Sequence, residues 1–298
     1  MNILNTPNEF LDFSVINYPN FNEKPGFEAY FYNYFISNKI KSEYTYIPIQ
    51  WTNYFVQHNY GKDIEKLKNF LKKNLSPTNK YFTVIQYDGG PLVELENCLI
   101  FNMGGMFSTS LPKTSKSISL PLIYEYNFSE NYIEKQYLAS YLGRPTHKIR
   151  TILEKKLKNE EGFYIENLDS MNSDIETINL EKYENLIKSS HFFLCPRGFG
   201  PASFRLYESI ELGTIPVYIS DEFVLPFDDI INWNKFSVII KKNKIGKLPK
   251  ILDAVVNSQM YEDMLEELLI VKNKYFNFQS TAEYIYKKIE NRWNEIFL

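Results

Sequence analysis

The sequence contains little that could hold a metal ion or form a cross-link. Its 298 residues include two cysteines, Cys98 and Cys195, three histidines and no Cys-x-x-Cys motif. A zinc site, which is built mainly from cysteine and histidine, is therefore not expected. The two cysteines lie far apart in apolar runs, so we expect two buried free thiols rather than a disulfide, as in a reducing compartment.

Long apolar runs and an excess of basic charge are also missing. No stretch approaches the about 18 apolar residues of a membrane span, and residues 1–22 lack the pattern of a signal peptide. The net charge of -3 gives no basic face for duplex nucleic acid. We therefore expect a cytoplasmic protein without a transmembrane span or nucleic-acid partner, in which a few placed groups hold any phosphate.

Two cofactor signatures are absent as well. No Gly-x-Gly-x-x-Gly follows an early strand with an acidic residue about 20 positions later, which argues against a dinucleotide-dependent oxidoreductase. No Asp-x-Asp pair is present to hold Mg²⁺ or Mn²⁺ across a diphosphate. We expect neither a cofactor nor a metal ion.

Aromatic residues are abundant, with 23 Tyr and 23 Phe. A compositional bias toward Asn, Ile, Lys, Tyr and Phe accounts for this, and stacking of some rings on sugar or base faces is the functional alternative.

Short apolar runs alternate with helical patterns, which is typical of an α/β fold with parallel sheets. The predicted strands are 44–51, 81–86, 98–103, 120–126, 136–142, 163–166, 192–195, 215–219 and 236–240. The predicted helices are 26–40, 62–74, 148–159, 180–188, 203–212, 250–270 and 281–297, and residues 108–119 are expected to be a loop. Two α/β halves meeting near residues 128–135, with a cleft between them, would follow.

The most informative segment is residues 191–220, which predicts a strand, a glycine loop, a helix and a second strand. Ligands of open parallel sheets bind beyond the carboxyl ends of the strands, where this loop lies. Gly198 and Gly200 allow a close approach of backbone to a ligand. Ser203 can cap the following helix, whose N-terminus favours a diphosphate.

Arg205 and Glu208 are three residues apart on that helix, so they share a face. An arginine fork matches phosphate oxygens, and a carboxylate can accept hydrogen bonds from both ribose hydroxyls. The alternative is a plain surface salt bridge, and spacing alone favours it.

The residues from Leu194 to Ser209, with Gly213-Thr-Ile-Pro-Val, Ser220-Asp, Leu225-Pro-Phe and Ile231-Asn-Trp after them, resemble the signature of exostosin-family glycosyltransferases. A weaker similarity links residues 141–150 to the segment that opens that family's C-terminal domain. The resemblance covers roughly residues 136–240. It implies the GT-B fold, with two facing Rossmann-like domains and a cleft between them.

The resulting domains are 1–130 on the acceptor side, 131–280 for the nucleotide sugar, and a last helix, 281–298, that packs back on the first. By resemblance, Arg205 and Glu208 bind the diphosphate and the ribose, and Arg144 and Arg197 add positive charge. For Asp221 and His147, capping or packing roles are expected.

The implied reaction is transfer of a hexose or pentose from a nucleotide donor, expected to be a UDP-sugar, to a glycan or lipid-linked acceptor in polysaccharide biosynthesis. It is expected to need no metal and to invert the anomeric centre. Asp88, at the end of strand 81–86, is the candidate general base, although Asp88-Gly89 is also a common turn. A carbohydrate- or nucleotide-binding module without turnover is the alternative.

Overall fold

The computed structural model describes residues 2–14, 24–105, 111–125, 127–129, 131–168 and 179–290. These residues form two compact units. The first comprises Met1–Glu125, Val224–Pro226 and Asn277–Leu298, and the second comprises Tyr126–Phe223 and Phe227–Phe276. Each unit contains one parallel sheet with helices packed on it, so the α/β class and the parallel sheets predicted from the sequence are confirmed.

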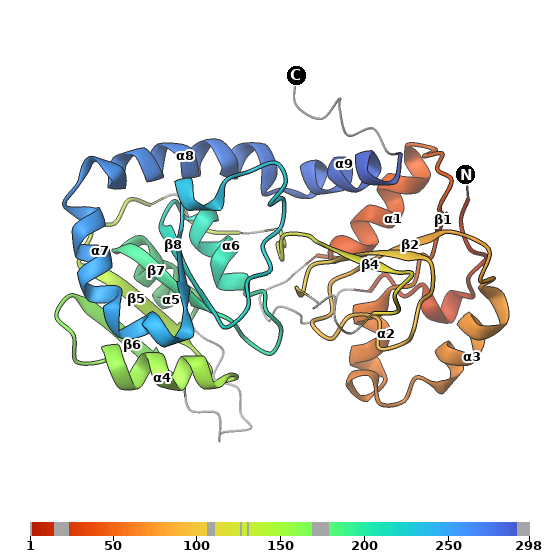
Figure 1. Cartoon of the computed structure of the whole chain (residues 1–298), viewed down its shortest axis with the longest axis horizontal. Coiled ribbons are helices and arrows are strands. Elements are labelled where there is room, and N and C mark those ends of the chain that lie inside the picture. Colours follow the sequence, from red (N-terminus) through yellow and green to blue (C-terminus); the bar gives the residue numbers. More distant parts are fainter. Residues whose placement is uncertain are drawn as a thin grey trace. The chain divides into compact units, whose positions relative to one another are not determined.

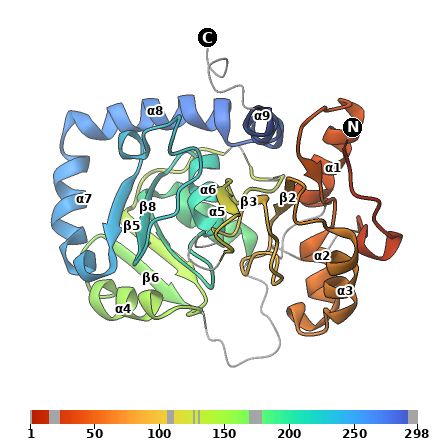
Figure 2. The same ribbon diagram turned by 45° about the vertical axis from the view of Figure 1, so that its right-hand side comes forward.

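The first unit holds a four-stranded sheet in the order β1-β2-β3-β4. Its strands are β1 (Thr45–Tyr46), β2 (Tyr81–Ile85), β3 (Cys98–Asn102) and β4 (Lys116–Ser119). Its helical segments are η1 (Asn8–Phe10), α1 (Phe27–Ser37), α2 (Trp51–Gln57), η2 (Asn59–Gly61), α3 (Glu65–Asn74) and α9 (Phe278–Ile289). Figure 2 shows α1, α2 and α3 gathered beside this sheet, and α9 contacts α1.

Many of the aromatic side chains in this unit pack against one another in its core. The rings of Phe31, Phe35, Tyr46 and Phe82 lie against one another with centroids 4.8–6.3 Å apart. The indole N–H of Trp51 donates to Thr83 Oγ1 at 2.8 Å, which ties α2 to β2. These rings are buried and cannot stack on a ligand.

The second unit holds a five-stranded sheet in the order β6-β5-β7-β8-β9. Its strands are β5 (Tyr137–Gly143), β6 (Phe163–Asn167), β7 (Ser190–Pro196), β8 (Ile215–Ser220) and β9 (Val238–Lys241). Its helical segments are α4 (Lys148–Leu157), α5 (Leu180–Lys188), α6 (Phe204–Glu211), η4 (Trp233–Lys235), η5 (Lys242–Lys247), α7 (Leu248–Val256) and α8 (Gln259–Tyr275). Figure 1 shows these strands enclosed by helices of the same unit.

The chain entering the second unit is anchored there by two charged side chains, Lys135 and Glu184. Lys135 Nζ donates to the carbonyls of Lys188 and Ser190 at 2.9 and 2.7 Å. The backbone N–H of Ser129 donates to Glu184 Oε1 at 2.8 Å. The residues expected near the junction of the two halves are therefore bonded within the second unit.

Four sequence predictions about elements are wrong, two of them because of proline. Pro48 and Pro121 lack the N–H that a sheet ladder requires, so β1 ends before Pro48 and residues 120–125 form no strand. The strand at that edge is β4, inside the segment expected to be a loop. The predicted helix 250–270 is two helices, because Ser258 adopts extended dihedrals and starts α8 anew.

Both cysteines are buried free thiols, as predicted, with Cys98 in β3 and Cys195 in β7. Of the predicted last helix, residues 278–289 form α9, and 291–298 lie outside the described residues. Among the helices that the structure describes, none combines the length and apolarity needed to span a membrane.

Candidate functional site

The second sheet has a topological switch point between β5 and β7. These neighbouring strands are parallel, and the chain leaves β5 toward β6 on one side and β7 toward β8 on the other. Ligands of open α/β sheets bind at the carboxyl ends of the strands where the direction of winding reverses. The loops at this position are residues 143–147 and 196–203. They contain Arg144, Arg197, Gly198 and Ser203, four of the predicted site residues.

Each of the two loops runs directly into the N-terminus of a helix. His147 caps α4, with its Nδ1 accepting from the backbone N–H of Ile149 at 3.3 Å. Burial and the nearby Arg197 lower the pKa of His147, which favours the neutral form that this cap requires. His147 is therefore a capping residue, as predicted.

Ser203 is the N-cap residue of α6, but its side chain makes no capping bond. The residue is 4% exposed, and its Oγ has no hydrogen-bond partner among the described residues. A buried hydroxyl normally has a partner, so this atom is available to a ligand at the helix N-terminus.

Arg205, in the first turn of α6, reaches back to the end of β5. Its Nε donates to the carbonyl of Leu142 at 2.9 Å, and its guanidinium lies 5.6 Å from the centre of the Tyr141 ring. A Cβ on Gly143 would lie 2.2 Å from Arg205 Nη2, so only glycine at 143 leaves room for the guanidinium. Burial disfavours the charge, but the surrounding phenol and carboxylate oxygens outweigh it and raise the pKa of Arg205.

Glu208 is 4% exposed and accepts a hydrogen bond from the Tyr183 hydroxyl of α5 at 2.5 Å. It interacts electrostatically with Arg205, as its spacing on α6 predicts. Burial and the nearby Glu208 raise the pKa of Tyr183 far above its ordinary value, so this phenol stays a donor. The ribose role of Glu208 stays a prediction.

Arg197 shapes its own loop. Nη1 pairs with Asp221 Oδ1 at 2.7 Å, and Nη2 donates to the Phe199 carbonyl at 3.1 Å. Asp221 thus holds Arg197, a contact that the expected capping role did not foresee.

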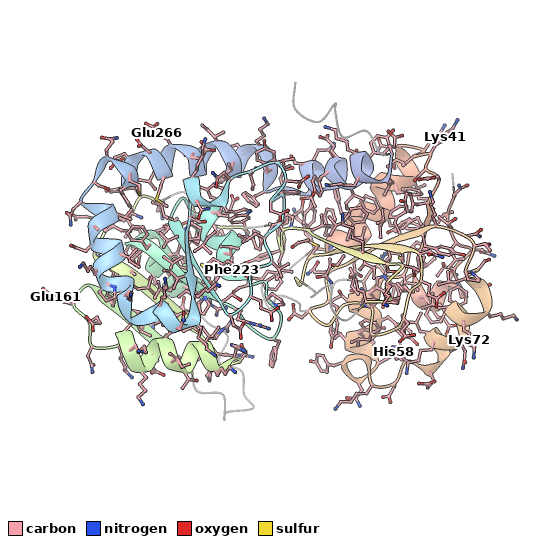
Figure 3. The ribbon with its side chains drawn as sticks, in the orientation of Figure 1. Lys41, His58, Lys72, Glu161, Phe223 and Glu266 are labelled. Carbon is pink, nitrogen blue, oxygen red and sulfur yellow. The ribbon has the colours of Figure 1, made fainter. Side chains whose placement is uncertain are left out.

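The opposite side of this loop is fixed by β8. The Tyr218 hydroxyl donates to the Pro201 carbonyl at 3.0 Å. The ring of Phe223, labelled in Figure 3, lies 5.7 Å from that of Tyr218. The ring of Phe199 at the loop tip is 76% exposed.

Arg150 is the residue that sequence analysis missed. It lies in the first turn of α4 and is 4% exposed. Its Nε and Nη2 donate to the carbonyls of Arg197 and Pro196 at 3.0 and 3.3 Å, and its Nη1 donates to the carbonyl of Arg144 at 2.9 Å. It therefore joins the two loops. The available signal was a charged residue three positions before Leu153, on the apolar face of a predicted helix.

A family model described as the exostosin GT47 domain matches residues 73–255, which is more than half of the chain. The chain belongs to the exostosin GT47 family.

Curated relatives agree with this membership. A probable glycosyltransferase of Arabidopsis thaliana is 37% identical over 123 residues, which are 40% of this chain and 24% of the relative. Another from the same plant is 29% identical over 210 residues, 65% of this chain and 42% of the relative. The exostosin-1 homolog of Caenorhabditis elegans is 24% identical over 208 residues, 59% of this chain and 54% of the relative. The chain thus spans about half or less of these relatives.

Among solved structures, the crystal structure of TarM aligns with 85% of this chain and 56% of its own, at 13% identity and a TM-score of 0.43.

The predicted general base of this exostosin chain, Asp88, belongs to the first unit. It is half-buried and follows β2, beyond the strand's carboxyl end. A Cβ on Gly104 would lie 2.5 Å from the Asp88 Cα, so the turn that carries Asp88 packs against bare backbone after β3. Among the residues described, no three His, Cys, Asp or Glu side chains cluster as metal ligands.

Proposed function

We propose that this exostosin chain is a glycosyltransferase that moves a sugar from a nucleoside diphosphate, with UDP as the nucleotide, to a glycan or lipid-linked acceptor. One arrangement carries the proposal. At the switch point of the second sheet, the N-termini of α4 and α6, the buried guanidinium of Arg150 and the partly buried guanidinium of Arg205 meet around glycine-bearing loops. Helix N-termini and guanidinium groups both favour bound anions.

The donor diphosphate is proposed to lie at the N-terminus of α6. Arg205 supplies a charge-assisted contact there, and the unpartnered Oγ of Ser203 supplies a neutral donor. Arg144 adds positive charge from the neighbouring loop, and Arg197 holds its own loop in shape. Glu208 is proposed to take the ribose, which requires its carboxylate to exchange the Tyr183 hydroxyl for the ribose hydroxyls.

Leaving-group stabilisation in this proposal comes from the protein. As the glycosidic bond to the diphosphate breaks, negative charge grows on the phosphate oxygens. Preorganised donors aimed at that charge lower the barrier in a site with little water. Two guanidinium groups and two helix N-termini supply them, so we propose that turnover needs no divalent metal.

We propose Asp88 as the general base of a single, inverting displacement. In that reaction the acceptor hydroxyl loses its proton as its oxygen attacks the anomeric carbon. Asp88 lies at the carboxyl end of β2, the edge at which parallel sheets bind their ligands.

A nucleotide titration tests the site. Arg205→Ala removes one charge-assisted contact, worth about 1.5–3 kcal/mol, so the Kd for UDP measured by calorimetry rises at least tenfold. Glu208→Ala should also weaken UDP. Lys155→Ala, in the last turn of α4, is the control and leaves the Kd unchanged. Unchanged UDP binding in both site variants would overturn the assignment.

The alternative, a binding module without turnover, makes a different prediction. Such a module would bind glycan or UDP with the same residues but would release no nucleotide from a nucleotide sugar.

A further inference from the structure

Two donor atoms, from the neighbouring loop and helix, lie against the bare face of Gly198. A Cβ placed on Gly198 would lie 3.1 Å from Arg150 Nη2 and 3.6 Å from Thr146 Oγ1. We propose that one phosphate oxygen of the donor binds the Thr146 hydroxyl beside Gly198, at a position that we call the Gly198 seat, and that Arg150 positions this hydroxyl. The inference rests on the proposed function and extends it to Thr146, which has no role there, and to the positioning role of Arg150.

Thr146 brings a hydroxyl that lacks a partner. Its Oγ1 is buried and makes no hydrogen bond to any of the described residues. The backbone of the same residue is fixed, because its N–H donates to the Arg144 carbonyl at 2.8 Å. A buried hydroxyl that stays unpaired destabilises the protein. A ligand oxygen above Gly198 would satisfy it.

Arg150 holds the two loops of the seat in place through hydrogen bonds to both. Three of its five N–H donors go to carbonyls of the two loops, and a further contact goes to the Tyr141 hydroxyl. These bonds set the distance between Thr146 on one loop and Gly198 on the other. Burial and the nearby Arg205 lower the pKa of Arg150 to about 10, so it stays charged at neutral pH.

The chemistry of the seat selects an anionic oxygen. The Thr146 hydroxyl and the Arg150 guanidinium border the seat. Ser203 adds a second unpartnered hydroxyl at the start of α6, on the same loop as Gly198. A phosphate oxygen has the charge and lone pairs to accept from several donors at once. A cation would be repelled by the buried guanidinium.

Thr146→Val and Thr146→Ser test the seat, because valine keeps the shape of threonine and serine keeps the hydroxyl. We expect the Kd for UDP to rise about tenfold in Thr146→Val and to stay within about twofold of the unmodified chain in Thr146→Ser. Thr151→Val, an exposed position on the same helix, is the control. Gly198→Ala places a methyl group 3.1 Å from Arg150 Nη2 and 3.6 Å from Thr146 Oγ1, which crowds both groups and should weaken UDP binding.

Thermal unfolding without ligand separates binding from structure. Because the Thr146 hydroxyl has no partner, its removal in Thr146→Val should leave the Tm unchanged or raise it. A lower Tm in Thr146→Val that Thr146→Ser restores would mean that the hydroxyl is structural and would overturn the proposal.

Competition with inorganic pyrophosphate identifies the part of UDP that the seat holds. Pyrophosphate should displace UDP from the unmodified chain and displace it less well from Thr146→Val. If the unmodified chain binds UDP and Thr146→Val binds it equally well, the seat is wrong and the proposed function stands. If the unmodified chain binds neither UDP nor GDP, the proposed function itself fails.

Discussion

Gly143→Ala should weaken the donor site while leaving the fold intact. The new Cβ would lie 2.2 Å from Arg205 Nη2, 2.8 Å from Arg205 Cζ and 2.8 Å from the Tyr141 hydroxyl. Gly143 is not among the glycines with positive φ, so alanine costs no backbone strain there. The flexible end of Arg205 must therefore swing away, losing its bond to the Leu142 carbonyl.

The expected loss of affinity follows from that displacement. A charge-assisted contact is worth about 1.5–3 kcal/mol, so the Kd for UDP should rise by about tenfold or more. Overpacking typically costs about 1–3 kcal/mol of stability, which circular dichroism and thermal unfolding would show as a modest loss of Tm with unchanged secondary structure. Gly246→Ala is a matched control, because its Cβ would meet only Lys156 Nζ at 3.5 Å.

A double-mutant cycle decides whether Gly143 acts through Arg205. In an Arg205→Ala background, Gly143→Ala should change UDP affinity by less than about twofold, because the displaced group is already absent. Additive losses, or a Gly143→Ala variant that binds UDP like the unmodified chain, would refute the reasoning.

Three further predictions concern the base, the metal and a buried carboxyl. Asp88→Asn should lower kcat by about 10²–10⁴-fold with UDP still bound, and turnover within a few-fold of the unmodified enzyme would move the role elsewhere. EDTA should not abolish turnover, and a full loss restored by Mn²⁺ would contradict metal independence. Burial raises the pKa of Glu28 to about 7, so stability should be greatest below about pH 4.5 and fall as pH rises through 7, by on the order of 3 kcal/mol. Urea unfolding between pH 4.5 and 8 would measure this free energy of unfolding. In Glu28→Gln it should no longer fall with pH, and an equal pH dependence in the variant and the unmodified chain would contradict the raised pKa of Glu28.

The local pattern of the site could be predicted from the sequence. Residues 191–220 show apolar runs of strand length on both sides of a glycine loop and a helix, and the structure has β7, α6 and β8 there. The shared helix face of Arg205 and Glu208 follows from their spacing, whereas their assignment to the nucleotide rests on the exostosin resemblance and stays a prediction. The strand ends at Pro48 and Pro121 were also readable, since proline cannot donate to a ladder.

The roles of Arg150 and Glu28 could not be predicted from a local sequence pattern. Arg150 binds carbonyls 46 and 47 positions away. Glu28 accepts from the backbone N–H of Gln86, 58 positions away, at 2.7 Å. Both depend on which strands become neighbours in the sheet, and a local pattern does not contain that information. The role proposed for Gly198 depends on Arg150 and Thr146, which only the folded structure shows to lie beside it.

Nucleotide release is the most direct test of the central claim. The chain would be incubated with a panel of UDP- and GDP-sugars and oligosaccharide acceptors, and the released nucleotide and the mass of the glycan product would be measured. We expect release of UDP from at least one UDP-sugar, a product heavier by one sugar residue, and loss of both in Arg205→Ala. Tight UDP binding without release or product from any donor would contradict the enzymatic claim and favour the binding module.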